Sequence, residues 1–485
     1  MSRTVILGAG ISGHTAATRL RQRLGTEHEV LVVTPNARWN WIPSNIWVGV
    51  GRMTMDDVTF ALAPVYQKLG ITYVQAKGTQ IHPEGDAEGA GPYVTVEHTS
   101  PESSGEVERI PYDFLVNATG PRLNFGAVPG LGPTGHSLSV CTAAHATETA
   151  GALERIIAKL EAGERQVLVI GTSHGTCTCE GAAFEYVFNV EHEIRKRGLR
   201  HLADIVYLSN EHELGDFGVA GLHMEVGGYV TASKSWAESL YAERGIRWIL
   251  QAHVERVEEG EVFYETLDGT RHSLRFDFAM LLPPFTGVGL TSYDRAGHDT
   301  TTELFAPNGF MRVDADYTAK PFEEWVPGDW PSTYQTPRFD NIFAVGIAFA
   351  PPHAISKVFK SPNGTVISPA PPRTGMPSGI MGRVVANTIA DRITRGRAAP
   401  AHRASMATMG AACVASAGTG MLSGTAAAMT MFPIVPDYVR FPGTGRDLRF
   451  TFGEIGLGAH WIKRLLHHAF LWKAKGKLGW QLIPE

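Results

Sequence analysis

Four cysteines carry the most reactive side chains of this chain, and two of them share one short segment. Cys177 and Cys179 lie in QVLVIGTSHGTCTCEGAAFE, residues 166–185, which has the pattern of a strand, a glycine turn and the start of a helix. A thiol at a helix N-terminus is favoured as the thiolate, because the helix dipole stabilises negative charge. The segment therefore predicts a reactive thiol at Cys179, with Cys177 as a second candidate.

The N-terminal segment predicts a dinucleotide site. Gly8, Gly10 and Gly13 form a G-x-G-x-x-G fingerprint that follows a strand-like run and opens a helical stretch. Glycines at these positions permit the tight turn and let a pyrophosphate approach the helix N-terminus. The acidic residue that usually binds the ribose, about 20 positions further on, is missing, and Asn36 is the candidate to replace it.

The turn in front of Cys177 lacks that fingerprint. It reads Gly171-Thr-Ser-His-Gly175, and Asn210-Glu211 is a poor match to the acidic ribose-binding position. The segment therefore predicts a second dinucleotide-type fold with a degenerate nucleotide site. A thiol in that place favours a flavoprotein that takes electrons from sulfur and not from NADH.

Composition limits the class of protein. The 485 residues allow two or more domains with a large core, and 44% apolar and 19% charged residues indicate a globular chain. A net charge of −5 argues against nucleic acid as a partner. Four cysteines are too few for a disulfide scaffold. The first strand is expected at Thr4, which leaves no room for a secretory signal peptide, so we expect a cytoplasmic location.

Local patterns predict further elements. Helices are expected at 143–161 and 374–393, and a strand-like run covers 341–350. The aromatic, proline-broken segment 38–52 and the proline-rich segment 351–372 are predicted to be loops, and the second is long enough to be a functional candidate.

An uncharged segment separates Arg403 from Asp437. It is too rich in glycine and small polar residues for a membrane-spanning helix. We expect a buried strand–turn–strand unit there, with Cys413 as a small core residue.

The C-terminal segment predicts an amphipathic helix. In HWIKRLLHHAFLWKAKGK, residues 460–477, basic side chains occupy one face and apolar side chains the other. The expected apolar stripe is Trp461, Ile462, Leu465, Leu466, Ala469, Phe470 and Trp472. This pattern is typical of a helix that lies in a membrane interface. The alternative is a helix that packs on the protein's own core.

Seven stretches occur in the order found in one family. They are PSNIWVGVG (43–51), YDFLVNATGPRL (112–123), PGLGP (129–133), SVCTAAHA (139–146), CEGAAFE (179–185), NIFAVGIAFA (341–350) and PPRTG (371–375). On these stretches the chain resembles the sulfide:quinone oxidoreductases and, more distantly, the flavoprotein subunit of flavocytochrome c sulfide dehydrogenase. The resemblance implies an α/β fold with two Rossmann-like domains, as in glutathione reductase, and a C-terminal membrane-associating segment.

The resemblance also implies a division into domains. An FAD-binding domain is expected in two parts, residues 1–160 and 291–400. A second Rossmann-like domain that carries Cys179 is expected at 161–290, and a C-terminal domain with the amphipathic helix at 401–485.

Site roles follow from the same resemblance. It implies FAD as the cofactor, sulfide as the substrate and quinone as the electron acceptor, with no metal. Gly8, Gly10 and Gly13 would hold the FAD pyrophosphate. Further FAD contacts are implied at Thr119, Gly120, Gly346 and Thr374. The implied catalytic residues are Cys179 on the sulfide-oxidising face, Cys141 at a position sometimes joined to FAD by a thioether, and His145 near the active site.

The chain departs from the family at one position. Family members carry a second sulfide-side cysteine, which we place at about Thr333, where this chain has none. Cys177 and Cys141 are the candidates for the partner of Cys179. His145, His174 and Lys360 are candidates for proton transfer.

These observations predict a membrane-peripheral, homo-oligomeric flavoprotein. It would oxidise sulfide to polysulfide or sulfur through a cysteine persulfide and pass electrons to membrane quinone. Two alternatives stay open. One is a sulfide-oxidising or sulfur-carrying flavoprotein that delivers electrons or sulfur to a protein partner, and the other is a type II NADH dehydrogenase.

Overall fold

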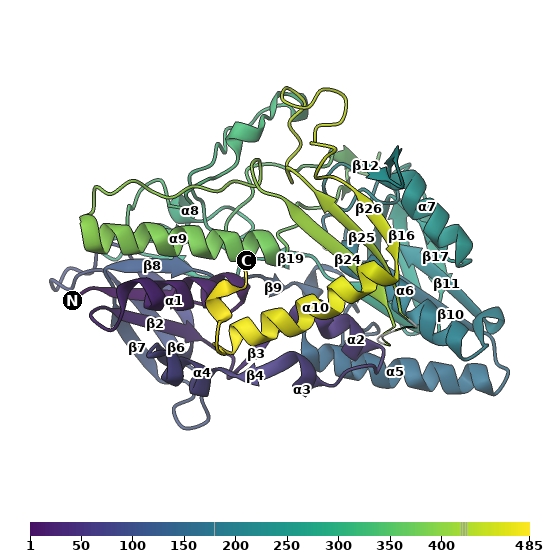
Figure 1. The fold of residues 1–485 in the computed structure, drawn as a ribbon, viewed down its shortest axis with the longest axis horizontal. Coiled ribbons are helices and arrows are strands. Elements are labelled where there is room, and N and C mark those ends of the chain that lie inside the picture. The colour runs from purple at the N-terminus through teal and green to yellow at the C-terminus, as the bar shows by residue number, and fades with distance from the viewer. Residues whose placement is uncertain (179, 419, 421, 423) are drawn as a thin grey trace.

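The computed structural model describes residues 1–178, 180–418, 420, 422 and 424–485. Cys179 lies outside these residues. Two parallel sheets, each flanked by helices, form the two halves of the molecule, and the C-terminal strands and helix α10 lie across them (Figure 1).

The first sheet contains the N-terminal strand, in the order β21–β8–β1–β2–β5–β6–β7 with β20 beside β5. β21, β8, β1 and β2 are parallel, and β5, β6 and β7 form an antiparallel extension. β1 and β2 are almost continuous apolar runs because helices or loops cover both faces of a parallel sheet. The strands are β1 (Arg3–Leu7), β2 (Glu29–Thr34), β5 (Thr72–His82), β6 (Tyr93–His98), β7 (Val107–Pro111), β8 (Phe114–Asn117), β20 (Thr291–Ser292) and β21 (Ile342–Ala344).

Helix α1 (Ile11–Leu24) follows β1, and helix α9 (Gly375–Arg395), from far along the chain, packs beside it (Figure 1). A glycine permits this close approach, because a Cβ on Gly382 would lie 2.3 Å from Ser12 O.

The second sheet has the order β14–β11–β10–β18 and is parallel throughout. An antiparallel sheet, β15–β16–β17, extends from it. The strands are β10 (Gln166–Thr172), β11 (Ala203–Leu208), β14 (Arg247–Ile249), β15 (Ala252–Glu258), β16 (Glu261–Thr266), β17 (Arg271–Arg275) and β18 (Phe278–Leu282). Its helices are α5 (Ala143–Glu161), α6 (Glu180–Lys196) and α7 (Ser233–Glu243).

The C-terminal part contains an antiparallel sheet and one long helix. β24 (Ala411–Ala417), β25 (Thr425–Met431) and β26 (Gly453–Gly456) pair in sequence, and α10 (Leu457–Ala474) follows β26 directly. β24 also packs against α6 of the second half. Within the described part of the chain, no helix is long and apolar enough to cross a membrane. The predicted buried strand–turn–strand unit is confirmed by β24 and β25.

Short elements connect these parts. They are β3 (Arg38–Asn40), α2 (Asn45–Gly49), α3 (Met55–Val58), β4 (Thr59–Ala61), α4 (Leu62–Leu69), β9 (Arg122–Leu123), β12 (His223–Val226), β13 (Tyr229–Ala232), β19 (Phe285–Thr286), α8 (Thr301–Leu304), β22 (Phe359–Lys360) and β23 (Val366–Ile367).

The helix predicted at 143–161 has those bounds, and the one predicted at 374–393 runs from 375 to 395. The prediction of a loop at 38–52 is wrong, since the segment holds β3 and α2. Three tryptophans of this segment, Trp39, Trp41 and Trp47, are buried, and their burial orders the backbone despite the proline.

Candidate active site

The glycines of the N-terminal turn are placed as the fingerprint requires. Gly8 has φ +99°, and a Cβ there would lie 2.2 Å from Ala118 O. A Cβ on Gly13 would lie 2.0 Å from Gly8 O. Gly10 begins α1 without a side-chain cap and has open space around it. The helix N-terminus therefore presents uncapped amides to solvent, which suits a pyrophosphate.

The ends of three further elements meet this turn. Thr119 and Gly120 follow β8, and Thr119 Oγ1 donates to Asn117 Oδ1 at 2.8 Å. Gly346 follows β21 with φ +66°, and a Cβ there would lie 2.1 Å from Ser12 Oγ. Thr374 immediately precedes α9. The fold thus brings these predicted FAD contacts to one edge of the first sheet.

Asn36 lies just beyond β2, which neighbours β1 in the sheet. Its side chain is exposed and its carbonyl oxygen accepts a hydrogen bond from Tyr73 Oη at 3.1 Å. The position is compatible with a ribose contact through an amide in place of the usual carboxylate.

The glycine turn of the second sheet is closed by the protein itself. Its amides are already hydrogen-bonded, since Gly175 N donates to His253 Nδ1 at 3.0 Å and His174 N lies 3.2 Å from Cys177 Sγ. The segment around β23 covers the turn, and Ser368 N donates to Gly175 O at 2.7 Å. A Cβ on Gly175 would lie 2.0 Å from Val366 O. The predicted loop 351–372 thus contains the hairpin β22–β23, and it blocks this turn.

The acidic residue at the ribose position of the second sheet, Glu211, is also hydrogen-bonded within the protein. Glu211 is fully buried and accepts hydrogen bonds from Tyr207 Oη at 3.0 Å, Ser209 Oγ at 2.9 Å and Phe217 N at 3.0 Å. Its carboxylate is therefore not available to a ribose. Both parts of a pyridine-nucleotide site, the phosphate turn and the ribose acid, are occupied by internal contacts.

Cys177 is a core thiol. It is completely buried, its Sγ lies 3.2 Å from Leu282 O, and burial raises the pKa of its thiol to about 12. A thiol with so high a pKa is a poor nucleophile near neutral pH. These observations disfavour Cys177 as the partner of Cys179.

Cys141 is partly buried just before α5, where its amide donates to Ser139 Oγ at 3.2 Å. Burial raises the pKa of the Cys141 thiol to about 11. His145 follows in the first turn of α5, and its amide donates to Thr142 Oγ1 at 3.1 Å. Burial lowers the pKa of His145, so its imidazole is neutral near pH 7.

The other proton-transfer candidates differ in setting. His174 stacks edge-on to His253 at 4.6 Å, and burial lowers its pKa to about 4. Lys360 is exposed on β22. The residue at the family's second cysteine position, Thr333, lies in a turn whose amides donate to the Asp314 carboxylate, with Thr333 N at 2.8 Å. That turn has a structural role.

Cys413 has a position that the sequence did not reveal. It is partly buried on β24, and a Cβ on Gly181 would lie 3.2 Å from its Sγ. Its sulfur therefore lies against the first turn of α6, the helix that Cys179 immediately precedes in the sequence. Burial raises the pKa of the Cys413 thiol to about 11; the Glu185 carboxylate adds to the rise and the Lys463 ammonium opposes it. The small residues around Cys413 in the sequence are also typical of an unreactive core thiol, so nothing in the sequence signals this contact.

The predicted apolar stripe of α10 is divided. Four of its seven residues are exposed, and Leu466, Ala469 and Phe470 are half-buried, with the Phe470 ring stacked on Trp41 at 4.9 Å. Trp461, Ile462, Leu465 and Trp472 are exposed, and His460, Lys463 and His467 are buried. The predicted outward basic face is thus wrong for Lys463 and His467, because buried polar groups hold them. Lys463 Nζ donates to Glu185 Oε2 at 3.0 Å, and His467 Nδ1 lies 2.9 Å from Ser44 Oγ.

Known proteins match both the sequence and the fold. A family model described as pyridine nucleotide-disulphide oxidoreductase matches residues 2–217. A sulfide-quinone reductase of Aquifex aeolicus (strain VF5) is 30% identical over 97% of this chain and 90% of its own length. The chain belongs to the sulfide:quinone oxidoreductase family.

Other members of this family and its fold relatives agree. The crystal structure of the Aquifex aeolicus sulfide:quinone oxidoreductase superposes with a TM-score of 0.75 at 28% identity, over 98% of this chain and 92% of that one. A mitochondrial sulfide:quinone oxidoreductase of Mus musculus is 23% identical over 70% of this chain and 64% of that protein. An NDH2 structure from Plasmodium falciparum shares the fold at 12% identity, with a TM-score of 0.62 over 98% of this chain and 96% of that one. Family membership implies a bound flavin.

Proposed function

We propose that this protein oxidises sulfide at a pair of cysteines, Cys179 and Cys413, and passes the electrons through FAD to quinone at a membrane surface. The observation that carries the proposal is the placement of the Cys413 sulfur against the first turn of α6, 3.2 Å from a Cβ on Gly181. Cys179 is two residues before Gly181, and consecutive Cα atoms are about 3.8 Å apart. Chain geometry limits the Cα of residue 179 to about 7.6 Å or less from that of Gly181, and on this proposal its thiol meets the Cys413 sulfur.

The FAD site is formed by the N-terminal turn. The free amides at the start of α1, around Gly10 and Gly13, would bind the pyrophosphate, and Asn36 would contact the ribose. Gly8 would form the tight turn, since its own amide donates to Val33 O at 2.7 Å. Thr119, Gly120, Gly346 and Thr374 would line the remainder of the groove. Bound there, FAD supplies a two-electron acceptor.

The thiol pair would work as a disulfide. HS⁻ attacks one sulfur, the S–S bond breaks, and the electron pair leaves with the other cysteine as a thiolate. This yields a persulfide, CysS–SH, and CysS⁻. A second HS⁻ removes the outer sulfur as HSS⁻ and leaves a cysteine thiol. When the thiol and thiolate form the disulfide again, one proton and two electrons are released, so that two HS⁻ give HSS⁻, H⁺ and two electrons.

Burial and the Glu185 carboxylate raise the pKa of the Cys413 thiol, and the Lys463 ammonium is the nearby group that opposes this rise. Lys463 Nζ lies 3.3 Å from Val414 O, the next residue on β24, and its positive charge lowers the pKa of the Cys413 thiol. Glu185 holds this ammonium in place at 3.0 Å. The developing negative charge on sulfur would therefore form near a fixed cation.

The closed second turn disfavours the NADH dehydrogenase alternative. The backbone amides that would bind a pyrophosphate are hydrogen-bonded within the protein, and Glu211 is buried. Opening this turn would require the segment around β23 to leave Gly175. Sulfide is the reductant that this arrangement favours.

Quinone access depends on membrane docking of α10. Its outward face presents Trp461, Ile462, Leu465 and Trp472. Arg464 on α10 and Lys475 and Lys477 just after it reach the surface of the protein, which favours an anionic lipid surface. The protein would be a peripheral enzyme, and an apolar quinone would enter from the bilayer.

The cysteine assignment is tested by single substitutions. Cys179→Ser and Cys413→Ser should each abolish rapid reduction of the flavin by sulfide while the protein retains FAD, because either change removes the disulfide. Cys177→Ser is the matched control and should reduce at the parent rate. Stopped-flow absorbance of the flavin measures this, and a Cys413→Ser protein that reduces at the parent rate would overturn the pair.

A further inference from the structure

A second exposed apolar element lies apart from α10 in the sequence. The β12–β13 hairpin carries Tyr229 and Val230 just after its turn, with 80% and 56% of their surfaces exposed. The turn itself is Gly227-Gly228, where both residues have positive φ, 57° and 88°. Such a turn is tight and has no side chains, so the neighbouring apolar residues form its outer surface.

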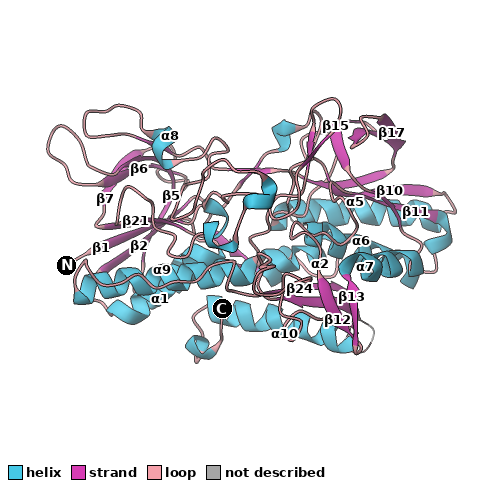
Figure 2. Ribbon diagram, turned by 90° about the horizontal axis from the view of Figure 1, so that it is seen from above, coloured by secondary structure: helices cyan, strands magenta, loops and turns pink. Residues whose placement is uncertain are grey.

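The hairpin is fixed to the strand that leads into α10. Glu225 N donates to Thr451 O at 3.1 Å. A Cβ on Gly453, the first residue of β26, would lie 3.0 Å from Met224 Sδ and 3.2 Å from Val226 Cγ2. In Figure 2, α10, β12 and β13 all lie along the same lower border of the molecule. The hairpin and α10 therefore belong to one side of the protein.

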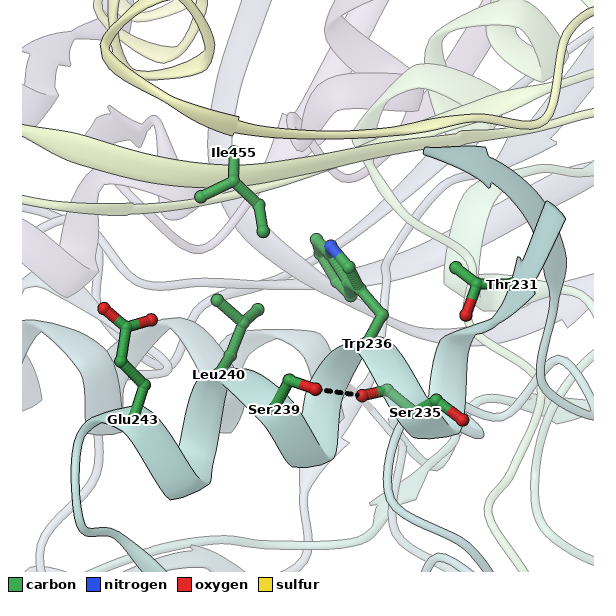
Figure 3. Close-up of a pocket in the computed structure, with 7 residues that line it drawn as sticks. All are labelled: Thr231, Ser235, Trp236, Ser239, Leu240, Glu243 and Ile455. Carbon is green, nitrogen blue, oxygen red and sulfur yellow. Dashed lines mark hydrogen bonds between the residues drawn. The ribbon is translucent and has the colours of Figure 1, made fainter. Parts of the chain in front are cut away.

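Exposed apolar residues continue between these two elements. Phe452 and Ile455 connect them, with 41% and 50% of their surfaces exposed. Beside Ile455, α7 and β13 border a hollow of about 290 Å³. Trp236 and Leu240 line it with Ile455 above them (Figure 3). Trp236 is 95% buried, and its indole Nε1 has no hydrogen-bond partner among the residues described.

We propose that the β12–β13 hairpin is a second membrane contact, with Tyr229 and Val230 seated in the lipid interface beside α10. This inference rests on the proposed docking of α10. Tyrosine is favoured at the interface, because its ring is apolar and its hydroxyl reaches the headgroups. Two contacts, joined through β26, fix the orientation of the protein on the bilayer. A single helix would leave the protein able to rotate about the helix axis.

Lipid fits this surface better than a second copy of the chain. The basic residues of the α10 side that reach the surface are Arg464, His468, Lys475 and Lys477, whereas Lys463 and Lys473 are paired with Glu185 and Glu485. Glu225 and Glu454 are exposed at its other end, on β12 and β26. A symmetric dimer centred on α10 would bring like charges together, because the same patch faces itself. Anionic lipid offers the complementary charge.

The test uses vesicles of phosphatidylcholine and phosphatidylserine and the full chain with its flavin. The Tyr229→Ser/Val230→Ser double variant should bind these vesicles about tenfold more weakly than the parent, since two apolar contacts are lost. Val107→Ser/Val326→Ser is the matched control, because these valines are 68% and 51% exposed on other elements; it should bind like the parent. Hydrogen exchange at 223–232 should slow when vesicles are added to the parent.

The outcomes separate the inference from the proposal beneath it. A Trp461→Ser/Leu465→Ser variant reports on α10 alone. If that variant loses binding and the hairpin variant binds like the parent, the inference is overturned and α10 docking stands. If the parent itself does not bind vesicles, docking of α10 is overturned as well. If the hairpin variant changes only the mass of the particle in solution, the hairpin contacts a second copy and the inference is wrong.

Discussion

Residue by residue, the candidate site depends on two glycines that leave room for other atoms. Gly10 keeps the start of α1 open, and Gly181 leaves space for the Cys413 sulfur. The first permits a phosphate to approach the helix, and the second lets a strand bring its thiol to the helix that Cys179 precedes. In both cases the chemistry depends on an absent side chain.

Gly181→Ala tests the space beside Cys413. The added Cβ would lie 3.2 Å from Cys413 Sγ, so the thiol must move by a few tenths of an ångström. We expect sulfide-dependent flavin reduction to slow by roughly 10–100-fold, because small displacements at a reacting atom are costly. Gly151→Ala in α5 is the control, since its Cβ would meet only Arg155 Nη1, at 3.7 Å. Equal rates in the two variants would mean that the Cys413 sulfur does not react.

Glu211→Gln tests the buried acid of the second sheet through stability. Burial raises the pKa of Glu211 from 4.5 to about 7. The folded state therefore binds this proton more tightly, so the stabilisation is complete below about pH 4 and is lost as pH rises through about 7. Between these limits the free energy of unfolding of the parent should fall by roughly 3 kcal/mol relative to the variant. Urea unfolding across this range measures it, and parallel pH curves would contradict the assignment.

At the scale of elements, α10 is attached by polar contacts on its inner face. His460 Nε2 lies 3.0 Å from Gly420 O and must carry the proton, so Nδ1 accepts from Ser416 Oγ. Lys463 bridges to α6 through Glu185, which is 92% buried at its side chain. Leu471 and the ring of Phe470 pack on the core as well, the latter stacked on Trp41 at 4.9 Å. The apolar residues left for another environment are Trp461, Ile462, Leu465 and Trp472.

Lys463→Met tests this attachment. The Glu185 carboxylate would remain buried without its cation, so we expect a loss of about 3–5 kcal/mol in the free energy of unfolding. Lys477→Met, at an exposed position just beyond α10, is the control. Adding Glu185→Leu to Lys463→Met should restore much of the stability, because no buried charge then remains. A Lys463→Met protein as stable as the control would show that the ion pair does not hold α10.

The whole molecule carries most of its large exposed apolar side chains on the C-terminal segment and the hairpin beside it. Leu422, Phe450, Phe452 and Leu478 are exposed there in addition to those of α10. A protein that contacts only water rarely exposes so many large apolar side chains together. Their concentration in the C-terminal segment and the hairpin is what a surface that docks on another body requires.

Local signals predicted the parts of the fold that depend on local physics. The glycine fingerprint, the apolar runs of β1 and β2 and the pattern of residues 143–161 all predicted elements that the structure has. The segment 38–52 was missed because buried tryptophans order it, which only tertiary packing decides. The strand-like run 341–350 is strand only at 342–344, because the backbone turns at Gly346, where φ is +66°.

Only those parts of the candidate site that lie within one short segment of the chain could be predicted from the sequence. The turn at Gly8 to Gly13 is such a segment. Cys413 and Gly181 are 232 positions apart, and their approach depends on β24 packing against α6. The burial of Lys463 was equally out of reach, since the acceptors that draw it inward belong to other parts of the chain.

The packing of α9 against α1 has a consequence for how the protein is made. The proposed cofactor site begins at Gly8 and also includes Gly346 and the start of α9 at Gly375, where a Cβ would lie 3.2 Å from Ile11 Cδ1. A ribosome has therefore joined every residue from Gly8 to Gly375 before the last part of that site emerges. Until then the N-terminal turn is an incomplete binding site. Insertion of the prosthetic group therefore has to follow the synthesis of α9.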